Sequence, residues 1–293
     1  MYMSKKSKKY TIAFMCRILL VTRQGYYKWL KNRDKPYKHA LLLARMKQIL
    51  AEDEENKNYG TVRMHEALKF KFKIKESQST VARVMRENGM IQPKKRNPNS
   101  LTKADKEAQK SDNLLKQNFT AEKPFEKCVG DITQLPTADG PLYISGMFDC
   151  FDNSCLGLAM DDNMRAELVE STINQAAQRY NLRKSIFHSD RGSQYTSEIV
   201  RKAMGKHGII QSMNSAAGRC HDNAKCESMW ARFKVEKIYG KESTAKMSME
   251  AVKALVFRYF MSYWNNRRIC SANGGLPPAE KRRRYFEGES KAA

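Results

Sequence analysis

The sequence predicts a mixed α/β core that follows a smaller, all-helical region. Up to about residue 92 the apolar residues recur at helical spacing, and from residue 128 short strand-like runs alternate with helical segments. With 41% hydrophobic residues and no run of about 18 apolar ones, the chain is predicted to be neither disordered nor membrane-spanning. The basic start lacks the long apolar core of a signal peptide, so we expect a soluble, cytoplasmic protein.

Positive charge is the strongest compositional signal. The 54 Lys and Arg residues against 31 Asp and Glu give a net charge of +23, and residues 1–123 alone carry 29 against 12, or +17. This excess favours a polyanion such as DNA as the partner, with most of the attraction supplied by the first part of the chain. A basic surface that only keeps the protein soluble is the alternative.

The seven cysteines indicate neither a disulfide framework nor a structural zinc site. Their number is odd, and no two form a C-x-x-C pair. Cys220, His221 and Cys226 lie near one another in the sequence, but a second ligand pair at the usual spacing is missing.

Two pairs of helices are expected in the helical region. The first pair lies within residues 10–32, where Thr22 is expected to cap the second helix of a unit with helix-turn-helix proportions. A helix over residues 41–50 follows, and the acidic residues 52–55 are expected to form its solvated end. The second pair is a helix ending near residue 68 and another that stops at Asn88 and Gly89.

The last of these helices is a candidate DNA-reading element. Ser79 is expected to cap it, and a capped second helix is the geometry in which helix-turn-helix proteins reach base edges. Arg83 and Arg86 lie on it as candidate DNA contacts, although a solvated charged face explains them equally well.

Residues 93–123 are predicted to form a polar, basic linker, with a helix near residues 103–117. Its compact basic run can track a phosphate backbone or stay solvated, and consists of Lys94, Lys95 and Arg96.

The core is predicted to contain five strands. In chain order they are residues 128–133, 142–149 and 156–160, a helix at 165–180, strand 185–187, a helix at 197–207 and strand 208–212. A helix that continues to Lys234 and another over residues 247–264 follow.

Three acidic residues lie where open α/β sheets place their chemistry. Asp131 interrupts the first strand, Asp190 follows the fourth just before Gly192, and Glu227 lies in the first turns of a helix. Three such carboxylates can converge on Mg²⁺, and a pair of these ions can activate a nucleophile and steady a leaving oxygen at a phosphodiester. Taken singly, each acid is more often a turn cap or a solvated side chain.

Two rival groups of residues are weaker candidates. Asp149 and Asp152 follow the second strand and its turn, so a role in the turn is favoured over metal binding. His188, Ser189 and Asp190 are neighbours in a strand and point alternately to opposite faces, which excludes a hydrolase relay.

Longer motifs connect the three acids with a known family. They are His188-Ser189-Asp190-Arg191-Gly192-Ser193-Gln194-Tyr195-Thr196-Ser197, Gln211-Ser212-Met213, and Cys220-His221-Asp222-Asn223-Ala224 followed by Glu227-Ser228. With the segment from Cys16 to Trp29, they resemble the second reading frame (OrfB) of the insertion sequence three family. These are bacterial DDE transposases with a retroviral-integrase-like core, and the resemblance covers residues 12–286.

The resemblance implies an α/β ribonuclease-H-like catalytic core, with a mixed five-stranded sheet and helices, preceded by an all-α helix-turn-helix region. It implies that Asp131, Asp190 and Glu227 form a DDE triad with two Mg²⁺ ions, for which Mn²⁺ would substitute. The implied reactions are cleavage at the element's ends, which frees a 3′-hydroxyl, and strand transfer by that hydroxyl. Movement would follow a copy-out, paste-in route through a circular intermediate.

The implied partners are DNA of the terminal repeats and of the target, other copies of the chain on that DNA, and a first-reading-frame protein by fusion or complex. No membrane is implied. Because no leucine-heptad segment is present, a second reading stays open: a catalytically silent DNA-binding regulator or a transposase remnant without its first-frame segment.

The assignment of Glu227 needs one departure from the family's spacing. Between Asp190 and Glu227 lie 36 residues, one more than is usual, which would put Cys226 at the position of the acid. Because a thiol is a poor Mg²⁺ ligand, we place the extra residue in the loop 214–218 and expect the acid to face the metals. Asp222 and Asn223 are then expected to cap the helix.

Two turns beyond Glu227, Lys234 is expected on the same helix face as a contact to terminal DNA, unlike Lys237. Arg191 is a further candidate DNA contact. Two more departures, Cys270 for the family's histidine and Asn273 for its leucine, put the role of the tail in question.

The expected organisation has four parts. They are a helix-turn-helix DNA-binding region (1–92), a basic linker (93–123), an integrase catalytic core (124–240) and a C-terminal helix with a basic tail (241–293).

Overall fold

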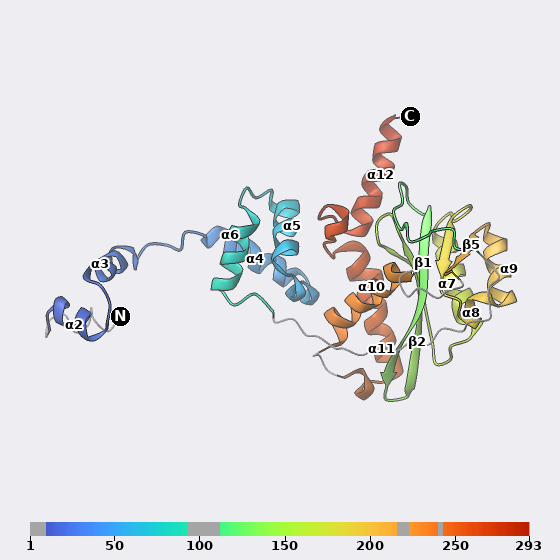
Figure 1. The fold of residues 1–293 in the computed structure, drawn as a ribbon, viewed down its shortest axis with the longest axis horizontal. Helices are drawn as coiled ribbons and strands as arrows, with labels where there is room; N and C mark the ends of the chain where they lie inside the picture. Colours follow the sequence, from blue (N-terminus) through green and yellow to red (C-terminus); the bar gives the residue numbers. More distant parts are fainter. Residues whose placement is uncertain (1–9, 93–111, 216–222, 240–242, 293) are drawn as a thin grey trace. The chain divides into compact units, whose positions relative to one another are not determined.

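The computed structural model describes residues 10–92, 112–215, 223–239 and 243–292 (Figure 1). The chain divides into two compact units, Met1–Arg45 and Met46–Ala293. The expected helix over residues 103–117 lies mostly outside the described residues, and its described end is not helical. None of the described helices combines the length and the apolar character that crossing a membrane requires.

The first unit is a pair of short helices, α2 (Ile12–Ile18) and α3 (Arg23–Asn32). The Thr22 hydroxyl accepts a hydrogen bond from the Gly25 amide across 3.0 Å, which confirms the predicted cap. A small buried cluster of Met15, Cys16 and Tyr26 joins the two helices.

The turn after α2 places a leucine in a backbone conformation that favours glycine. Leu20 has φ +53°, and the amide of the next residue, Val21, donates to the Cys16 carbonyl across 3.0 Å, which closes the helix end as a Schellman motif. The Leu20 side chain is 93% exposed, so little burial would be lost with it. We expect Leu20→Gly to stabilise this unit by about 0.5–1 kcal/mol, seen as stronger hydrogen-exchange protection of α3 amides in the full chain.

The matched control is Leu19→Gly, because Leu19 has φ −88° and gains nothing from glycine's freedom. Equal protection in the two variants would show that the left-handed backbone at Leu20 is not strained.

The second unit begins within α4 (Ala40–Glu52) and continues through η1 (Glu54–Asn58), α5 (Thr61–Phe72) and α6 (Gln78–Glu87). The cap of α6 was predicted wrongly by two residues, because Ser77 and not Ser79 accepts the hydrogen bond from the Thr80 amide. The predicted stop is confirmed, since Asn88 is the C-cap and Gly89 follows with φ +65°.

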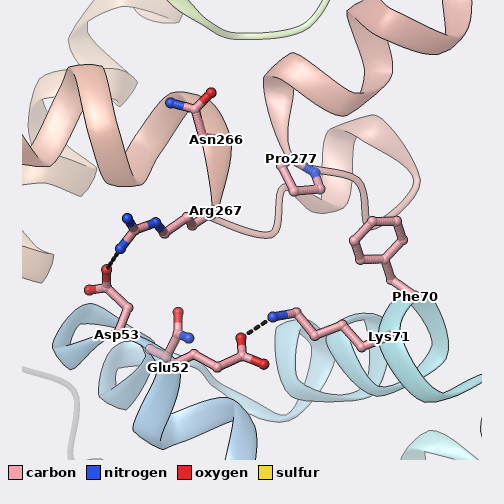
Figure 2. Close-up of a pocket in the computed structure, with 8 residues that line it drawn as sticks. Glu52, Asp53, Phe70, Lys71, Asn266, Arg267 and Pro277 are labelled. Carbon is pink, nitrogen blue, oxygen red and sulfur yellow. Dashed lines mark hydrogen bonds and ion pairs between the residues drawn. The ribbon is translucent and has the colours of Figure 1, made fainter.

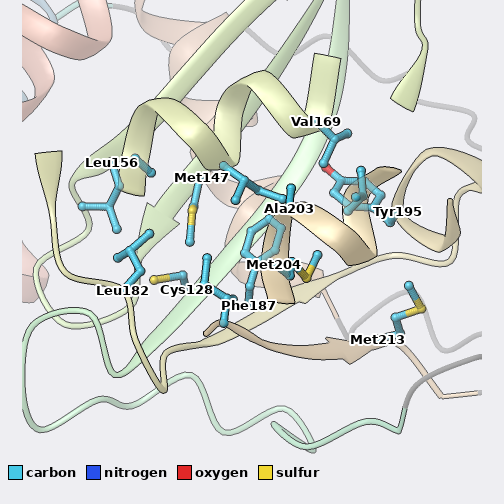
Figure 3. Close-up of a cluster of buried hydrophobic side chains, with 14 residues drawn as sticks. Cys128, Met147, Leu156, Val169, Leu182, Phe187, Tyr195, Ala203, Met204 and Met213 are labelled. Carbon is cyan, nitrogen blue, oxygen red and sulfur yellow. The ribbon is translucent and has the colours of Figure 1, made fainter. Parts of the chain in front are cut away.

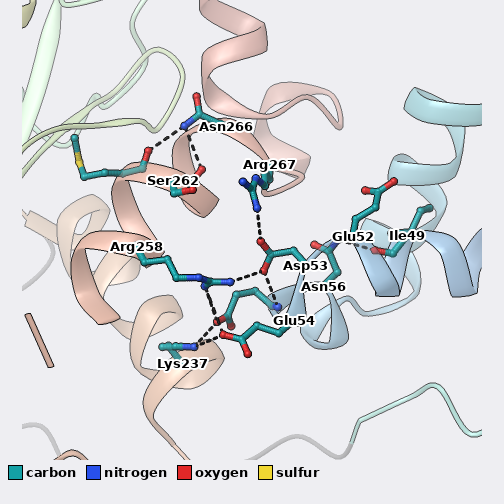
Figure 4. Close-up of polar contacts among 12 residues, drawn as sticks. Ile49, Glu52, Asp53, Glu54, Asn56, Lys237, Arg258, Ser262, Asn266 and Arg267 are labelled. Atoms are coloured by element: carbon teal, nitrogen blue, oxygen red, sulfur yellow. Dashed lines mark hydrogen bonds and ion pairs between the residues drawn. The ribbon is translucent and has the colours of Figure 1, made fainter. Parts of the chain in front are cut away.

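The prediction of a solvated acidic end after α4 was wrong for two of its four acids, since Glu52 and Glu54 are exposed but the other two are buried. Asp53 and Glu55 are only 6% and 2% exposed. Asp53 is paired with Arg258 and Arg267, and Glu55 with Lys237, all from the later helices (Figure 4). These carboxylates can be buried because distant cations compensate their charge.

The sheet confirms the predicted mixed, five-stranded core. Its strands are β1 (Lys127–Thr137), β2 (Gly140–Asp149), β3 (Cys155–Asp161), β4 (Ile186–Ser189) and β5 (Ile210–Met213), in the order β3-β2-β1-β4-β5. The first three strands are antiparallel, whereas β4 runs parallel to β1 and β5 parallel to β4. β1 is longer than predicted because its hairpin with β2 continues to a turn at Gly140, where φ is +117°.

Helices cover both faces of the sheet (Figure 1). One face carries α7 (Ala166–Arg179), α8 (Ser193–Thr196) and α9 (Glu198–His207) over a buried cluster that includes Met147 and Phe187 (Figure 3). The other face packs Phe148 against Trp230 of α10 (Ala224–Phe233) and Phe260 of the π-helical η5 (Arg258–Trp264). The remaining elements are η3 (Lys234–Ile238, π-helical), η4 (Thr244–Lys246), α11 (Met249–Phe257), η6 (Ser271–Asn273) and α12 (Pro278–Ala292).

Residues 46–92 contact the later helices, η1 against η3 and α5 against η6. They are thus part of the compact unit that also contains the sheet. The functional boundary predicted at residue 92 stays a prediction.

Candidate active site

The fold brings three carboxylates to one region from three elements. Asp131 lies within β1 and pairs across the hairpin with Gly146 of β2. Asp190 follows β4, the parallel neighbour of β1, and Glu227 lies in the first turn of α10, which packs on β1. Since Asp131 and Gly146 share a face, and the Trp230 ring lies against Gly146, Asp131 is on the face that α10 covers.

The charges of Asp190 and Glu227 act on Asp131. Burial, and after it the charges of Asp190 and Glu227, raise the pKa of Asp131 to about 7, although the Ile132 amide and Lys234 oppose the rise. Burial also raises the pKa of Asp190, against a 3.0 Å hydrogen bond that its Oδ1 accepts from the Gly192 amide. Negative charge is therefore concentrated here, with the Lys234 ammonium beside it.

The register of α10 separates Cys226 from Glu227. The Cys226 side chain is fully buried, and burial raises the pKa of its thiol well above the usual value, so it stays protonated. Glu227 is exposed and its charge reaches Asp131. The assignment of Glu227 as the third acid remains a prediction, and the loop proposed to hold the extra residue lies mostly outside the described residues.

Asn223 occupies the predicted N-cap position of α10, but its side chain makes no capping hydrogen bond. Its Nδ2 donates instead to the Gly130 carbonyl of β1 across 3.1 Å. Asp222 lies outside the described residues.

The donor chemistry fits a hard divalent cation. Three carboxylates supply oxygen ligands, and the neighbouring thiol is protonated and buried. Among the described residues no group of three or more His, Cys, Asp or Glu side chains is already arranged to hold a metal ion. The three carboxylates are thus close enough for their charges to interact, but they would have to move closer together to coordinate one cation.

The candidate DNA contacts are spread over the chain. Arg83 and Arg86 lie exposed on α6, and Lys234 follows α10. Arg191 is only 8% exposed, and its Nε donates to the Asn214 carbonyl across 2.7 Å. The basic run predicted to track phosphates lies outside the described residues, namely Lys94, Lys95 and Arg96. All remain predictions as DNA contacts.

The rival acids have the predicted turn role. Asp149 accepts hydrogen bonds from the amides of Phe125 and Phe151, and Asp152 from the Ser154 amide and from Arg282 of α12. The Arg282 guanidinium also lies over the rings of Phe125 and Tyr180, at 4.8 and 4.9 Å from their centroids. Part of the predicted basic tail therefore holds this turn in place.

His188 does not form a hydrolase relay with Ser189 and Asp190. Its ring nitrogens contact Ser212 Oγ at 2.8 Å and Asn214 Oδ1 at 3.0 Å, so it joins β4 to β5 and the residue beyond it.

The tail's departures from the family's residues have a structural consequence. Asn273 is buried, donates to the Asp152 carbonyl across 2.6 Å and accepts from Asn153 across 3.1 Å. Asn153 also lies 3.7 Å from the Cys270 sulfur. The two unusual residues thus fix the turn between β2 and β3.

A cavity of about 310 Å³ lies apart from the carboxylates (Figure 2). Two acids line it, and both are in ion pairs, Glu52 with Lys71 and Asp53 with Arg267. We therefore place the functional site at the carboxylates on the sheet.

The mixed five-stranded sheet with helices on both faces places the chain in the class of integrase-core proteins, since the Integrase core domain family model matches residues 121–220, where this sheet lies. The transposase InsF for insertion sequence IS3A of Escherichia coli (strain K12) is 32% identical over 285 residues, covering 95% of this chain and 96% of that protein. The chain therefore belongs to the IS3 family of insertion sequence transposases, and its function is transposition.

Two other proteins are similar to this chain at lower sequence identity. The insertion element IS600 uncharacterized 31 kDa protein of Shigella sonnei is 28% identical, covering 93% of this chain and 99% of that protein. A chain of the simian T-cell lymphotropic virus intasome in complex with PP2A regulatory subunit B56 gamma is 13% identical, with a TM-score of 0.38 over 67% of this chain and 63% of its own. That last likeness is too weak to build on.

Proposed function

We propose that Asp131, Asp190 and Glu227 are the DDE triad of a divalent-metal-dependent enzyme that cleaves DNA at the ends of the insertion sequence and joins them to target DNA. The observation that supports the proposal is the convergence of these carboxylates from β1, from the end of the neighbouring β4 and from α10, close enough for Asp190, Glu227 and Lys234 to act on the charge of Asp131. Two Mg²⁺ ions are the proposed cofactors, with Mn²⁺ as a substitute.

When bound, the two ions would stabilise charge on the phosphate and activate the attacking group, which is water in cleavage and a 3′-hydroxyl in strand transfer. Asp131 and Asp190, on neighbouring strands, give the fixed side of the site, and the exposed Glu227 can close on it from α10. In cleavage, a water oxygen forms a bond to phosphorus and the 3′-oxygen leaves as a hydroxyl. In strand transfer, that 3′-hydroxyl displaces a target 3′-oxygen in the same way.

The test is to incubate the purified full chain with Mg²⁺ and DNA carrying the element's ends, and to map any 3′-ends produced. Metal-dependent cleavage at the element boundary supports the enzyme. Specific binding without cleavage, in Mg²⁺ and in Mn²⁺, would favour a silent DNA-binding regulator or a transposase remnant. Sedimentation of the same mixtures would test the proposed assembly of several copies on DNA.

Lys234 is proposed to hold a phosphate of the terminal DNA next to the triad. Lys234→Ala should weaken cleavage and terminal-DNA binding about tenfold, the loss of one charge-assisted hydrogen bond. Gel-shift and cleavage assays on the same DNA measure both effects.

Lys237→Ala is the matched control, because Lys237 binds Glu54 at 2.9 Å and the buried Glu55 at 2.6 Å. Its loss should lower the melting temperature and leave terminal-DNA binding nearly unchanged. If both variants lost DNA binding equally, the phosphate role of Lys234 would have to be abandoned.

The helical region (1–92) and the linker (93–123) are proposed to supply most of the non-specific attraction for DNA. The first compact unit alone, residues 1–45, carries 12 Lys and Arg against one Asp, a net charge of +11. A chain that starts at Met46 should therefore bind duplex DNA more weakly and with a shallower dependence on salt than the full chain. Equal salt slopes by fluorescence anisotropy would show that this charge does not face DNA.

A further inference from the structure

We infer that Asn223 is a positioning residue that fixes Glu227 relative to Asp131, an inference that rests on the proposed triad. Its amide donates from Nδ2 to the carbonyl of Gly130, the residue immediately before Asp131 in β1, across 3.1 Å. Glu227 lies in the first turn of α10, four residues after Asn223, the N-cap residue of that helix. One hydrogen bond thus links the segment that carries the third acid to the strand that carries the first.

Four residues define the helix face that meets the sheet. Asn223, Glu227, Trp230 and Lys234 stand at spacings of four, three and four residues, which places them along one side of a helix. Asn223 and Trp230 are 3% and 4% exposed, whereas Glu227 between them is exposed. The helix is therefore fixed on both sides of the acid while the acid itself stays accessible.

The two anchoring points on the sheet are glycines next to Asp131. Gly146 is the cross-strand partner of Asp131, and a Cβ on it would lie 2.9 Å from the Trp230 ring. Gly130 precedes Asp131, and a Cβ on it would lie 2.3 Å from the Phe187 ring. Close packing at both glycines holds β1 in place, so the carbonyl that Asn223 contacts is a fixed reference for the helix.

The hydrogen bond also fixes the orientation of the Asn223 amide, because the reverse orientation would bring Oδ1 against the Gly130 carbonyl oxygen. A first-turn asparagine ordinarily caps its own helix, which contributes about 1 kcal/mol. The Asn223 side chain makes no such capping hydrogen bond and instead donates to the strand β1. Its Oδ1 is buried and has no hydrogen-bond partner among the described residues, so the side chain's one polar contact there is to β1.

The experiment measures metal binding and cleavage in the full chain carrying Asn223→Ala or Asn223→Asp. We expect the dissociation constant for Mn²⁺, followed by electron paramagnetic resonance, and the half-saturating Mg²⁺ concentration for cleavage to rise about tenfold, as for other residues that orient metal ligands. The aspartate variant should be affected at least as much, since its carboxylate faces a carbonyl oxygen. DNA affinity without metal should change little in both variants, and the melting temperature should change little in Asn223→Ala, whereas the buried charge of Asn223→Asp should lower it.

Asn266→Ala is the matched control, because the Asn266 amide also donates to backbone carbonyls, those of Met261 and Ser262, at an exposed position. It should bind Mn²⁺ as the unaltered chain does. Unchanged Mn²⁺ binding in both Asn223 variants, alongside a Glu227→Gln protein that has lost it, would overturn the positioning role and leave the triad standing. Unchanged Mn²⁺ binding in Glu227→Gln itself would instead refute the triad.

Discussion

Asp131→Asn, Asp190→Asn and Glu227→Gln are each expected to lower metal-dependent cleavage by at least about 10³-fold. Each change removes one anionic oxygen ligand and keeps the shape of the side chain. A metal site contributes several kcal/mol to the transition state, and about 4 kcal/mol corresponds to a factor of 10³. DNA binding should survive in all three, because the role proposed for the acids is to hold the cation, and their negative charge does not attract the DNA backbone.

The measurement is single-turnover cleavage of end-containing DNA, with a gel shift of the same DNA in the absence of metal. Asp162→Asn is the control, since Asp162 is an exposed acid beyond the end of β3. It should cleave at the normal rate. Cleavage at the normal rate by any one of the three triad variants would show that the triad contains another residue.

The elements of the core could be predicted from the sequence because their signals are local. Strand-like runs of apolar residues, the Thr22 cap and the stop at Asn88 and Gly89 each depend on a few neighbouring residues. The grouping of Asp131 and Asp190 as site residues depended on the resemblance to a family, since apolar patterns alone indicate only a mixed α/β fold; that β4, which Asp190 follows, lies beside β1 is a finding of the structure.

Apart from the α6 cap, which was misplaced by two residues, the main errors concern contacts between residues far apart in the chain. Asp53 and Glu55 look solvated in the sequence because their cations lie about 180 to 210 residues later, at Lys237, Arg258 and Arg267. Asn223 looks like a cap because the sequence does not show that the Gly130 carbonyl, 93 residues earlier, lies within reach. No local pattern could have signalled either contact.

Glu236→Ala is expected to lower the free energy of unfolding by about 3–5 kcal/mol. Glu236 is buried in η3, and it accepts two hydrogen bonds from Arg268, at 2.7 and 3.0 Å, and one from Tyr259 at 2.8 Å. Arg63 of α5 lies within ion-pair distance at 2.8 Å. Removing the carboxylate leaves Arg268, itself 4% exposed, as a buried charge without its partner, which is the costly way to break a buried ion pair.

The same group gives stability a pH dependence at the acidic end. Burial alone would raise the pKa of Glu236, but the charge and hydrogen bonds of Arg268, with Arg63 and Tyr259, lower it from 4.5 to about 2. A carboxyl whose pKa is lower in the folded state stabilises fully above its unfolded pKa, and this stabilisation is lost as the pH falls through about 2. Glu236→Gln should therefore remove part of the stability loss that the unaltered chain shows between about pH 4.5 and 2.

Denaturant unfolding of the full chain at pH 7 and at several lower pH values measures both effects. Glu198→Gln is the matched control, because Glu198 forms an exposed pair with Lys202 at 2.9 Å and should contribute less than about 1 kcal/mol. If water could replace the ion pair of Glu236 without loss of stability, Glu236→Ala and Glu198→Gln would have the same free energy of unfolding. If the Glu236 carboxylate is stabilised by Arg268, the free energy of unfolding of Glu236→Ala should lie several kcal/mol below that of the unaltered chain at pH 7. This difference should shrink towards pH 2, because protonation removes the charge of Glu236 and with it the attraction of Arg268.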